Sequence, residues 1–193
     1  ILCEGLATVL FALICTRFLC KNMKKRDFRL VPWLPYVLTG CGSAMLFLLG
    51  GLSPWTFYGI AFLFVLLYAS VQDHSIHEAD DILPVMMLML AVTNISEATV
   101  LSQLLGAAIV GGAQMLIALC GKKRMGIGGA DIKLSTAAAL LLGFYKGVIG
   151  FMLGLLIAVV AQLIITHRKK EQRTQPFALL PYLSVGLWIG FLI

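Results

Sequence analysis

The chain has 193 residues, of which 60% are hydrophobic and 12% are charged, and its mean hydropathy is +0.96. This composition excludes an ordinary soluble domain and indicates an integral membrane protein. Apolar runs near the roughly 20 residues that a helix needs to cross a bilayer recur along the chain and leave no room for a separate soluble domain. We therefore expect an all-α polytopic fold in which residues 1–193 form a single transmembrane domain.

The net charge of +6 does not indicate nucleic acid, because the basic residues gather in short loops between apolar runs. By the positive-inside rule, such loops lie on the cytoplasmic side of a membrane. The cysteines lie in or at the ends of apolar runs, without a Cys-x-x-Cys pair or a histidine at ligand spacing. We interpret them as small buried hydrophobic residues rather than zinc ligands or disulfides.

The first apolar run ends at Cys20 and precedes a basic loop at 21–29. It lacks the basic n-region and the cleavage site of a signal peptide, so we count it as a retained span. A second run covers 31–52 and turns at Ser53-Pro54, and a third covers 55–71. Asp73 then follows on the same inner side as the first basic loop.

The second half of the chain continues the alternation. Five further runs are expected as helices, and they cover 82–93, 100–120, 132–143, 147–166 and 177–193. Residues 144–146 are expected as a turn. A basic loop at 121–124 comes after the run 100–120, and another at 167–173 comes after the run 147–166. The map has about eight helical segments with both termini outside, and every Lys and Arg except Lys146 falls on or near the inside.

Two segments, 82–93 and 132–143, are short, with about 12 apolar residues against the roughly 20 of a full crossing. A re-entrant hairpin at either place would reverse every later span and move basic loops outside. We therefore expect both to span. Their inner ends would begin in a polar, water-accessible cavity, with Asp73 and Asp131 near its floor.

Asp131 follows the glycine-rich turn 126–129 and precedes an apolar run. A carboxylate at the edge of a bilayer is costly, so a functional role is the default hypothesis. Asp73 lies at the same depth and is its candidate partner. Two adjacent carboxyls share one proton, so one acts as a base on water while the other protonates a carbonyl oxygen. This is the chemistry of an aspartyl protease.

Two structural interpretations compete with catalysis. Asp131 also suits the N-cap of the helix that starts at Ile132, with Gly128-Gly129 as an ordinary turn. Asp73 also suits a solvated loop that contains Glu78, Asp80 and Asp81. Spacing alone does not choose between them.

Three segments of the chain resemble motifs of a known protein family. The segment 128–134, Gly-Gly-Ala-Asp-Ile-Lys-Leu, resembles the Gly-x-Gly-Asp-[Val/Ile]-Lys-Leu signature of the type IV prepilin peptidases. These membrane aspartyl proteases remove short basic leaders from pilin-like precursors. Val71-Gln72-Asp73 is similar to the site of the family's first aspartate, and 181–186 to a proline-containing motif in its last helix.

The chain departs from the family at three places. Ala130 stands where the signature has glycine, which makes a positive φ costlier. The Ile-Pro-Asn sequence common after the first aspartate is absent, and Glu78-Ala79-Asp80-Asp81 stands there instead. The paired Cys-x-x-Cys insertion of larger members is also absent, so the resemblance implies a short form without zinc.

The resemblance implies a catalytic dyad of Asp73 and Asp131, with no metal and no cofactor. Its implied partners are prepilin or pseudopilin precursors and membrane lipids, and its implied location is a bacterial cytoplasmic membrane, with the active site on the cytoplasmic side. We expect Lys133 to orient Asp131 or to lie at the lipid headgroups, and His74 and His77 to be polar loop residues. The substrate-binding candidates are Gly128, Gly129, Ala130, Lys133, Glu78, Asp80 and Asp81.

Two alternative functions remain open from the residues. A magnesium-dependent polyprenyl or lipid-phosphate transferase would use Asp73, Asp80 and Asp81 as metal ligands, and a chelator would stop its reaction. A membrane transporter would use the acids as a proton or ion relay and would show an inverted repeat.

Overall fold

A computed structural model describes residues 2–25, 33–76, 80–94, 98–120, 128–168 and 178–193. Within these ranges the chain forms eight α-helices and no strand, which confirms the expected all-α fold. The helices are α1 (Leu2–Lys25), α2 (Leu34–Gly50), α3 (Pro54–Ile76), α4 (Ile82–Thr93), α5 (Val100–Cys120), α6 (Gly129–Leu142), α7 (Phe144–Arg168) and α8 (Leu180–Leu192).

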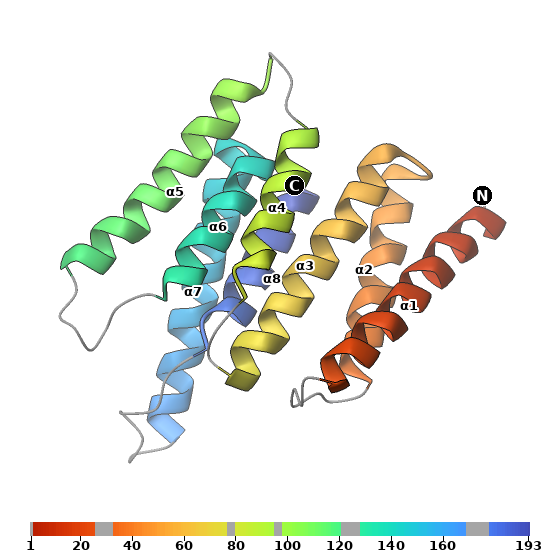
Figure 1. Ribbon diagram of the computed structural model, residues 1–193, viewed down its shortest axis with the longest axis horizontal. Coiled ribbons are helices and arrows are strands. Elements are labelled where there is room, and N and C mark those ends of the chain that lie inside the picture. Colours follow the sequence, from red (N-terminus) through yellow and green to blue (C-terminus); the bar gives the residue numbers. More distant parts are fainter. Residues whose placement is uncertain (1, 26–32, 77–79, 95–97, 121–127, 169–177) are drawn as a thin grey trace.

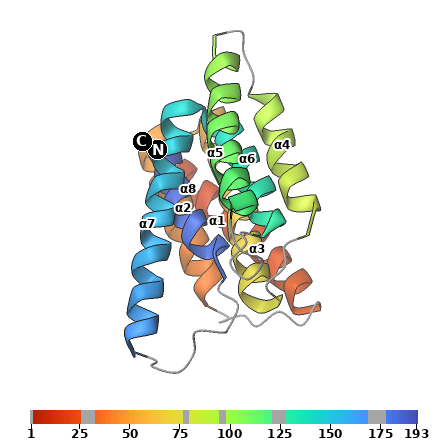
Figure 2. The same cartoon turned by 90° about the vertical axis from the view of Figure 1, so that its left-hand side faces the viewer.

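Successive helices run in opposite directions, and both chain termini lie in the upper half of the molecule in Figure 1. We call the opposite end, where α1, α3, α5 and α7 finish, the inner end. Three helices, α3, α5 and α7, are long and apolar enough to cross a membrane. Neither α4 nor α6 folds back as a hairpin, because each runs from the inner end to the outer end (Figures 1 and 2).

Several helix boundaries differ from those expected. The first helix continues to Lys25, so part of the first predicted basic loop is helical. The third continues to Ile76 and carries Asp73 inside it. The residues expected as a turn at 144–146 begin α7. The third basic loop begins inside α7, which ends at Arg168, and residues 26–29, 121–124 and 169–173 of the three loops lie outside the described residues.

The turn before α7 is made by Gly143, whose φ of +79° is a conformation that glycine adopts without strain. The backbone N–H of Phe144 donates to the Ser102 hydroxyl at 3.0 Å, which satisfies a free donor at the start of the helix. Gly143 and the Ser102 hydroxyl together allow the chain to reverse its direction between α6 and α7. Helix α7 therefore starts three residues before the apolar run 147–166.

Helix α8 is a third short helix, with 13 residues where the sequence predicts a longer final run over 177–193. It packs against α3 and α7, and most of its residues are buried. Stacked rings join it to α3, with Phe191 at 5.1 Å from Trp55 and 5.3 Å from Phe62 between centroids. A helix that is enclosed by other helices does not have to match the bilayer thickness.

Glycines bring α7 and α8 into close backbone contact. A Cβ on Gly186 would overlap the backbone of Gly150 and Gly154. A Cβ on Gly190 would come within 2.6 Å of the Lys146 carbonyl oxygen. This spacing of small residues is typical of tightly packed membrane helices.

The sequence also predicts close packing at Gly106, Gly111 and Gly112. A Cβ on Gly106 would lie 2.8 Å from the backbone of Gly143, just after the end of α6. A Cβ on Gly111 would lie 2.7 Å from the hydroxyl oxygen of Thr136 in α6. The prediction is wrong for Gly112, which faces open space.

Candidate active site

Asp73 lies in the last part of α3 and is 7% exposed, so the solvated-loop interpretation is wrong. Its Oδ2 accepts a hydrogen bond from the backbone N–H of Leu180 at 2.9 Å. Leu180 is the first residue of α8, and the start of a helix carries partial positive charge. The charged form of Asp73 is therefore stabilised by α8.

A second contact fixes α8 beside this carboxylate. The hydroxyls of Ser70 and Ser184 are hydrogen-bonded at 2.8 Å, one helical turn from Asp73 on α3 and one turn from Leu180 on α8. Two polar links between the same two helices set both their spacing and their register. The proline-containing segment 181–186 thus lies next to the first aspartate.

Asp131 is the third residue of α6 and is 9% exposed. The N-cap of this helix is Gly128, so the interpretation of Asp131 as N-cap is wrong. The carboxyl group turns back toward Gly128, whose backbone N–H hydrogen-bonds to it. A Cβ on Gly128 would lie 3.2 Å from Asp131 Oδ2, which is tighter than ordinary contact.

The glycine at 128 is needed for space rather than for an unusual backbone angle. Its φ is −60° and its ψ is 139°, an extended conformation open to any residue. Ala130 lies in the first turn of α6, so the expected cost of alanine at a positive φ does not arise. Gly128 and Gly129 are exposed beside the carboxyl group, and an added Cβ on Gly129 would touch nothing.

The two carboxyl groups lie close enough to affect each other. Asp131 precedes the apolar part of α6 and is outside the three long spanning helices. Its pKa is raised to about 6, chiefly by burial and also by the negative charge of Asp73. The hydrogen bond from the Gly128 N–H acts in the opposite direction and lowers the pKa. Two acids 58 residues apart in sequence thus meet at the inner end, where one of them takes up a proton more readily than a free aspartate does.

A buried polar contact between Gln114 of α5 and Ser135 of α6 supports the backbone at Asp131. The Ser135 hydroxyl is hydrogen-bonded to the Asp131 carbonyl oxygen at 2.6 Å, and Gln114 Nε2 donates to that hydroxyl at 2.7 Å. Both side chains are almost fully buried. The sequence-based predictions missed this pair, although a glutamine inside the apolar run 100–120 was a signal that could have found it.

Lys133 pairs with Asp81 rather than with Asp131. Its Nζ donates to Asp81 Oδ1 at 2.6 Å, and the two side chains are 58% and 79% exposed. An ion pair this exposed contributes at most about 1 kcal/mol, so its main effect is to connect the starts of α4 and α6. Asp80 lies beside it, whereas Glu78 and His77 are outside the described residues. His74 is exposed in the last turn of α3.

The model of the type IV leader peptidase family matches residues 60–166 of the chain. This chain belongs to the type IV leader peptidase family. The match covers more than half of the chain and includes both aspartates, but it ends before 181–186, so that part of the resemblance stays a prediction. Neither a curated protein nor a solved structure matches the chain.

Family membership makes the chain a protease of the leader peptidase type, and its long apolar helices make it a membrane protein. The expected polar cavity does not correspond to either of two hollows on α3. Both are apolar, and neither aspartate lines them. In the described part of the chain, no three His, Cys, Asp or Glu side chains lie together as metal ligands would.

Proposed function

We propose that this leader peptidase is an aspartyl endopeptidase that removes the basic leader of type IV prepilin-like precursors, with Asp73 and Asp131 as its dyad. The proposed location is the cytoplasmic face of a bacterial cytoplasmic membrane. The observation that carries the proposal is the meeting of two buried carboxyl groups at one end of the helices, inside the residues that match the family.

The surroundings of the two acids support different roles in the first step. Asp73 accepts the Leu180 N–H at the start of α8, which favours its charged form, so it takes a proton from the attacking water. The raised pKa of Asp131 favours its protonated form, and this form gives its proton to the scissile carbonyl oxygen. The water oxygen bonds to the carbonyl carbon, and a tetrahedral diol results.

Collapse of the diol completes the reaction. Asp73 passes its proton to the leaving nitrogen as the C–N bond breaks, and a diol hydroxyl returns a proton to Asp131 as the new carboxyl group forms. The pair begins and ends with one proton between the two acids, so it titrates as a unit.

The substrate would approach beside Gly128 and Gly129. These residues are exposed next to Asp131 and present no side chain, which leaves room for an extended peptide backbone. Asp80 and Asp81, together with Glu78 outside the described residues, would face a basic leader. Because Lys133 already compensates Asp81, we expect a modest electrostatic contribution from that carboxylate.

The test is cleavage of a prepilin by Asp73→Asn and Asp131→Asn enzymes in membranes. We expect each change alone to reduce cleavage by about 1000-fold or more, because members of a catalytic unit fail together. Glu4→Gln, at the far end of α1, is the matched control and should cleave normally. Substantial cleavage by either aspartate variant would remove that residue from the mechanism.

A chelator separates the proposal from the metal-dependent alternative. Cleavage by a carboxyl dyad should continue when divalent cations are removed, since the acids themselves activate the water. Loss of cleavage on chelation, with recovery on adding Mg²⁺, would contradict the dyad mechanism.

A further inference from the structure

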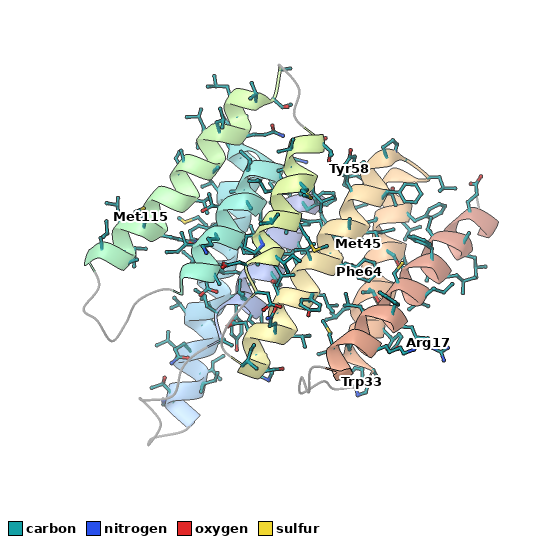
Figure 3. The ribbon with its side chains drawn as sticks, viewed as in Figure 1. Arg17, Trp33, Met45, Tyr58, Phe64 and Met115 are labelled. Carbon is teal, nitrogen blue, oxygen red and sulfur yellow. The ribbon has the colours of Figure 1, made fainter. Side chains whose placement is uncertain are left out.

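An apolar groove runs between α3 and α4, closed on one side by α1. Its inner section has a volume of about 580 Å³ and is lined by Leu19 of α1, Val65 and Tyr68 of α3, and Leu83, Met86 and Met89 of α4. Helix α4 packs mainly on α6 and only lightly on α3, which leaves a hollow between α3 and α4. Figure 1 shows α3 between α4 and the pair formed by α1 and α2, and Figure 3 labels Phe64, which also lines the groove.

The groove continues toward the outer end. A second hollow of about 460 Å³ begins at Leu52 and shares Ala61 and Leu90 with the first. Tyr58, labelled in Figure 3, lies on this outer section. Along α3 the two sections run from Pro54 to Tyr68, which is about 20 Å at the helical rise per residue. The groove is thus long enough to hold several turns of an apolar helix.

Gln72 lies on α3 one turn beyond Tyr68, the last residue of α3 that lines the groove. It follows Tyr68 by one turn and Val65 by two, so it shares their side of α3, and Asp73 comes next in the chain. Gln72 is 1% exposed, and its Oε1 has no hydrogen-bond partner among the described residues. A buried acceptor without a donor costs about 1 to 3 kcal/mol, so its presence requires an explanation.

A transmembrane helix that begins at the groove's inner end would supply the missing donor. The first four N–H groups of any helix have no partner within it, and in a bilayer they cannot bond to water. The same end of a helix is partially positive, which suits a place beside two carboxyl groups. Methionine side chains such as Met86 and Met89 adapt to different apolar surfaces, which suits a groove that receives another helix.

We infer that this groove binds the apolar helix of the precursor that follows the cleaved bond, and that Gln72 Oε1 accepts one of the first backbone N–H groups of that helix. The inference rests on the proposed function. The first residues of the bound precursor helix would then lie next to Gln72, which precedes Asp73 in α3. The extended precursor residues before that helix would reach the dyad. A lipid acyl chain would also fill the apolar section, but it has no N–H for Gln72.

The first test narrows the groove with Ala61→Phe, at the junction of its two sections. Ala108→Phe makes the same change on an exposed face of α5 and is the control. Each enzyme is given a full precursor and a short soluble peptide that ends soon after the cut. We expect Ala61→Phe to lower kcat/KM for the precursor about 10-fold or more and to leave peptide cleavage within about twofold.

Retained cleavage of the peptide shows that the Ala61→Phe enzyme is folded. Met89→Trp, at a more exposed groove position, is the second variant and should give the same contrast. If both variants cut the precursor as well as Ala108→Phe does, the groove holds only lipid and the inference is wrong. If wild-type enzyme cuts neither substrate, or Asp131→Asn cuts both, the proposed function itself fails.

The second test concerns Gln72 and uses Gln103→Met as a control, because Gln103 Oε1 on α5 is also buried without a partner among the described residues. Replacing Gln72 by methionine removes an unpaired acceptor at similar volume, so this variant should melt at an equal or higher temperature. Gln103→Met removes an unpaired acceptor too but also loses the 3.4 Å hydrogen bond from Nε2 to the Asn94 carbonyl oxygen, so it should melt at a similar or slightly lower temperature. Only Gln72→Met should raise KM for the precursor, by about 3- to 10-fold. An unchanged KM in a stabilised Gln72→Met enzyme would overturn the role of Gln72.

Discussion

Asp73 and Asp131 are chemically identical side chains that the fold treats differently. Asp73 receives a main-chain N–H from the start of α8, whereas Asp131 is buried beside another acid with the Gly128 N–H as its compensation. The difference in surroundings, rather than in residue type, separates the proposed base from the proposed acid.

The raised pKa of Asp131 predicts a pH-dependent cost in stability. Its pKa is 3.8 without the fold and about 6 within it, so the folded protein binds the proton more tightly and loses stability as pH rises from about 4 to above 6. Asp131→Asn removes this cost, on the order of 2 to 3 kcal/mol above pH 6, and its amide oxygen can still accept the Gly128 N–H.

Thermal unfolding in detergent at two pH values checks this expectation. The Asp131→Asn protein should melt at a higher temperature than wild type at pH 8 and at a similar temperature at pH 4. A variant that is equally stabilised at both pH values would contradict a titrating group as the cause.

At the residue scale, the sequence identified both acids but not their partners. A carboxylate in an apolar chain is conspicuous, so Asp73 and Asp131 stood out as candidates, and the resemblance of 128–134 to the family signature favoured them over the other acids. Their partners could not be predicted, since Leu180 contributes a backbone N–H that every residue except proline has. The N-cap interpretation was wrong because Gly128 takes that position and leaves Asp131 as the third residue of α6.

At the scale of helices, hydropathy predicted how many there are better than where they end. It identified α4 with its observed bounds, but it extended the last helix over residues that come before α8 begins. Apolar sequence has the same appearance whether it faces lipid or other helices, so it does not distinguish a long spanning helix from a short enclosed one. The close contacts between the glycines of α8 and the backbone of α7 show that α8 is a short enclosed helix, which hydropathy does not show.

Gly186→Ala should destabilise the protein by about 1 to 3 kcal/mol or more, because the added methyl group overlaps the α7 backbone. Displacement of α8 should also lower cleavage, since α8 donates to Asp73. Gly112→Ala is the matched control. It adds a methyl group in open space within a helix and should be neutral or stabilising by about 0.5 to 1 kcal/mol.

Melting temperature and cleavage rate, measured on both glycine variants in one detergent, give the comparison. If Gly186→Ala behaved like Gly112→Ala, the close approach of α7 and α8 would be wrong.

At the scale of the whole molecule, the alternation of helices agrees with the map drawn from basic loops. The helix ends at Lys25 and Arg168 lie at the inner end together with both aspartates, and the two termini lie in the outer half (Figure 1). The loops that decided the orientation are mostly outside the described residues. The side of the membrane therefore stays a prediction from the positive-inside rule.

Reporter fusions in a bacterial host test that orientation. Alkaline phosphatase joined after α8 should be active, because it is exported, and a fluorescent protein joined there should be dark. The same reporters placed after Arg168, at the end of α7, should give the opposite result. Identical signals at the two sites would contradict an odd number of crossings between them.

The hydrogen bond from Leu180 to Asp73 has an evolutionary consequence. Because the donor belongs to the polypeptide backbone, the side chain at position 180 can change among relatives without loss of the interaction, provided that it does not become proline. An essential support of this carboxylate would then leave no invariant residue in an alignment. Mutational scans would also pass over it at every side chain except proline, and an amide-to-ester replacement at that peptide bond would reveal what it contributes.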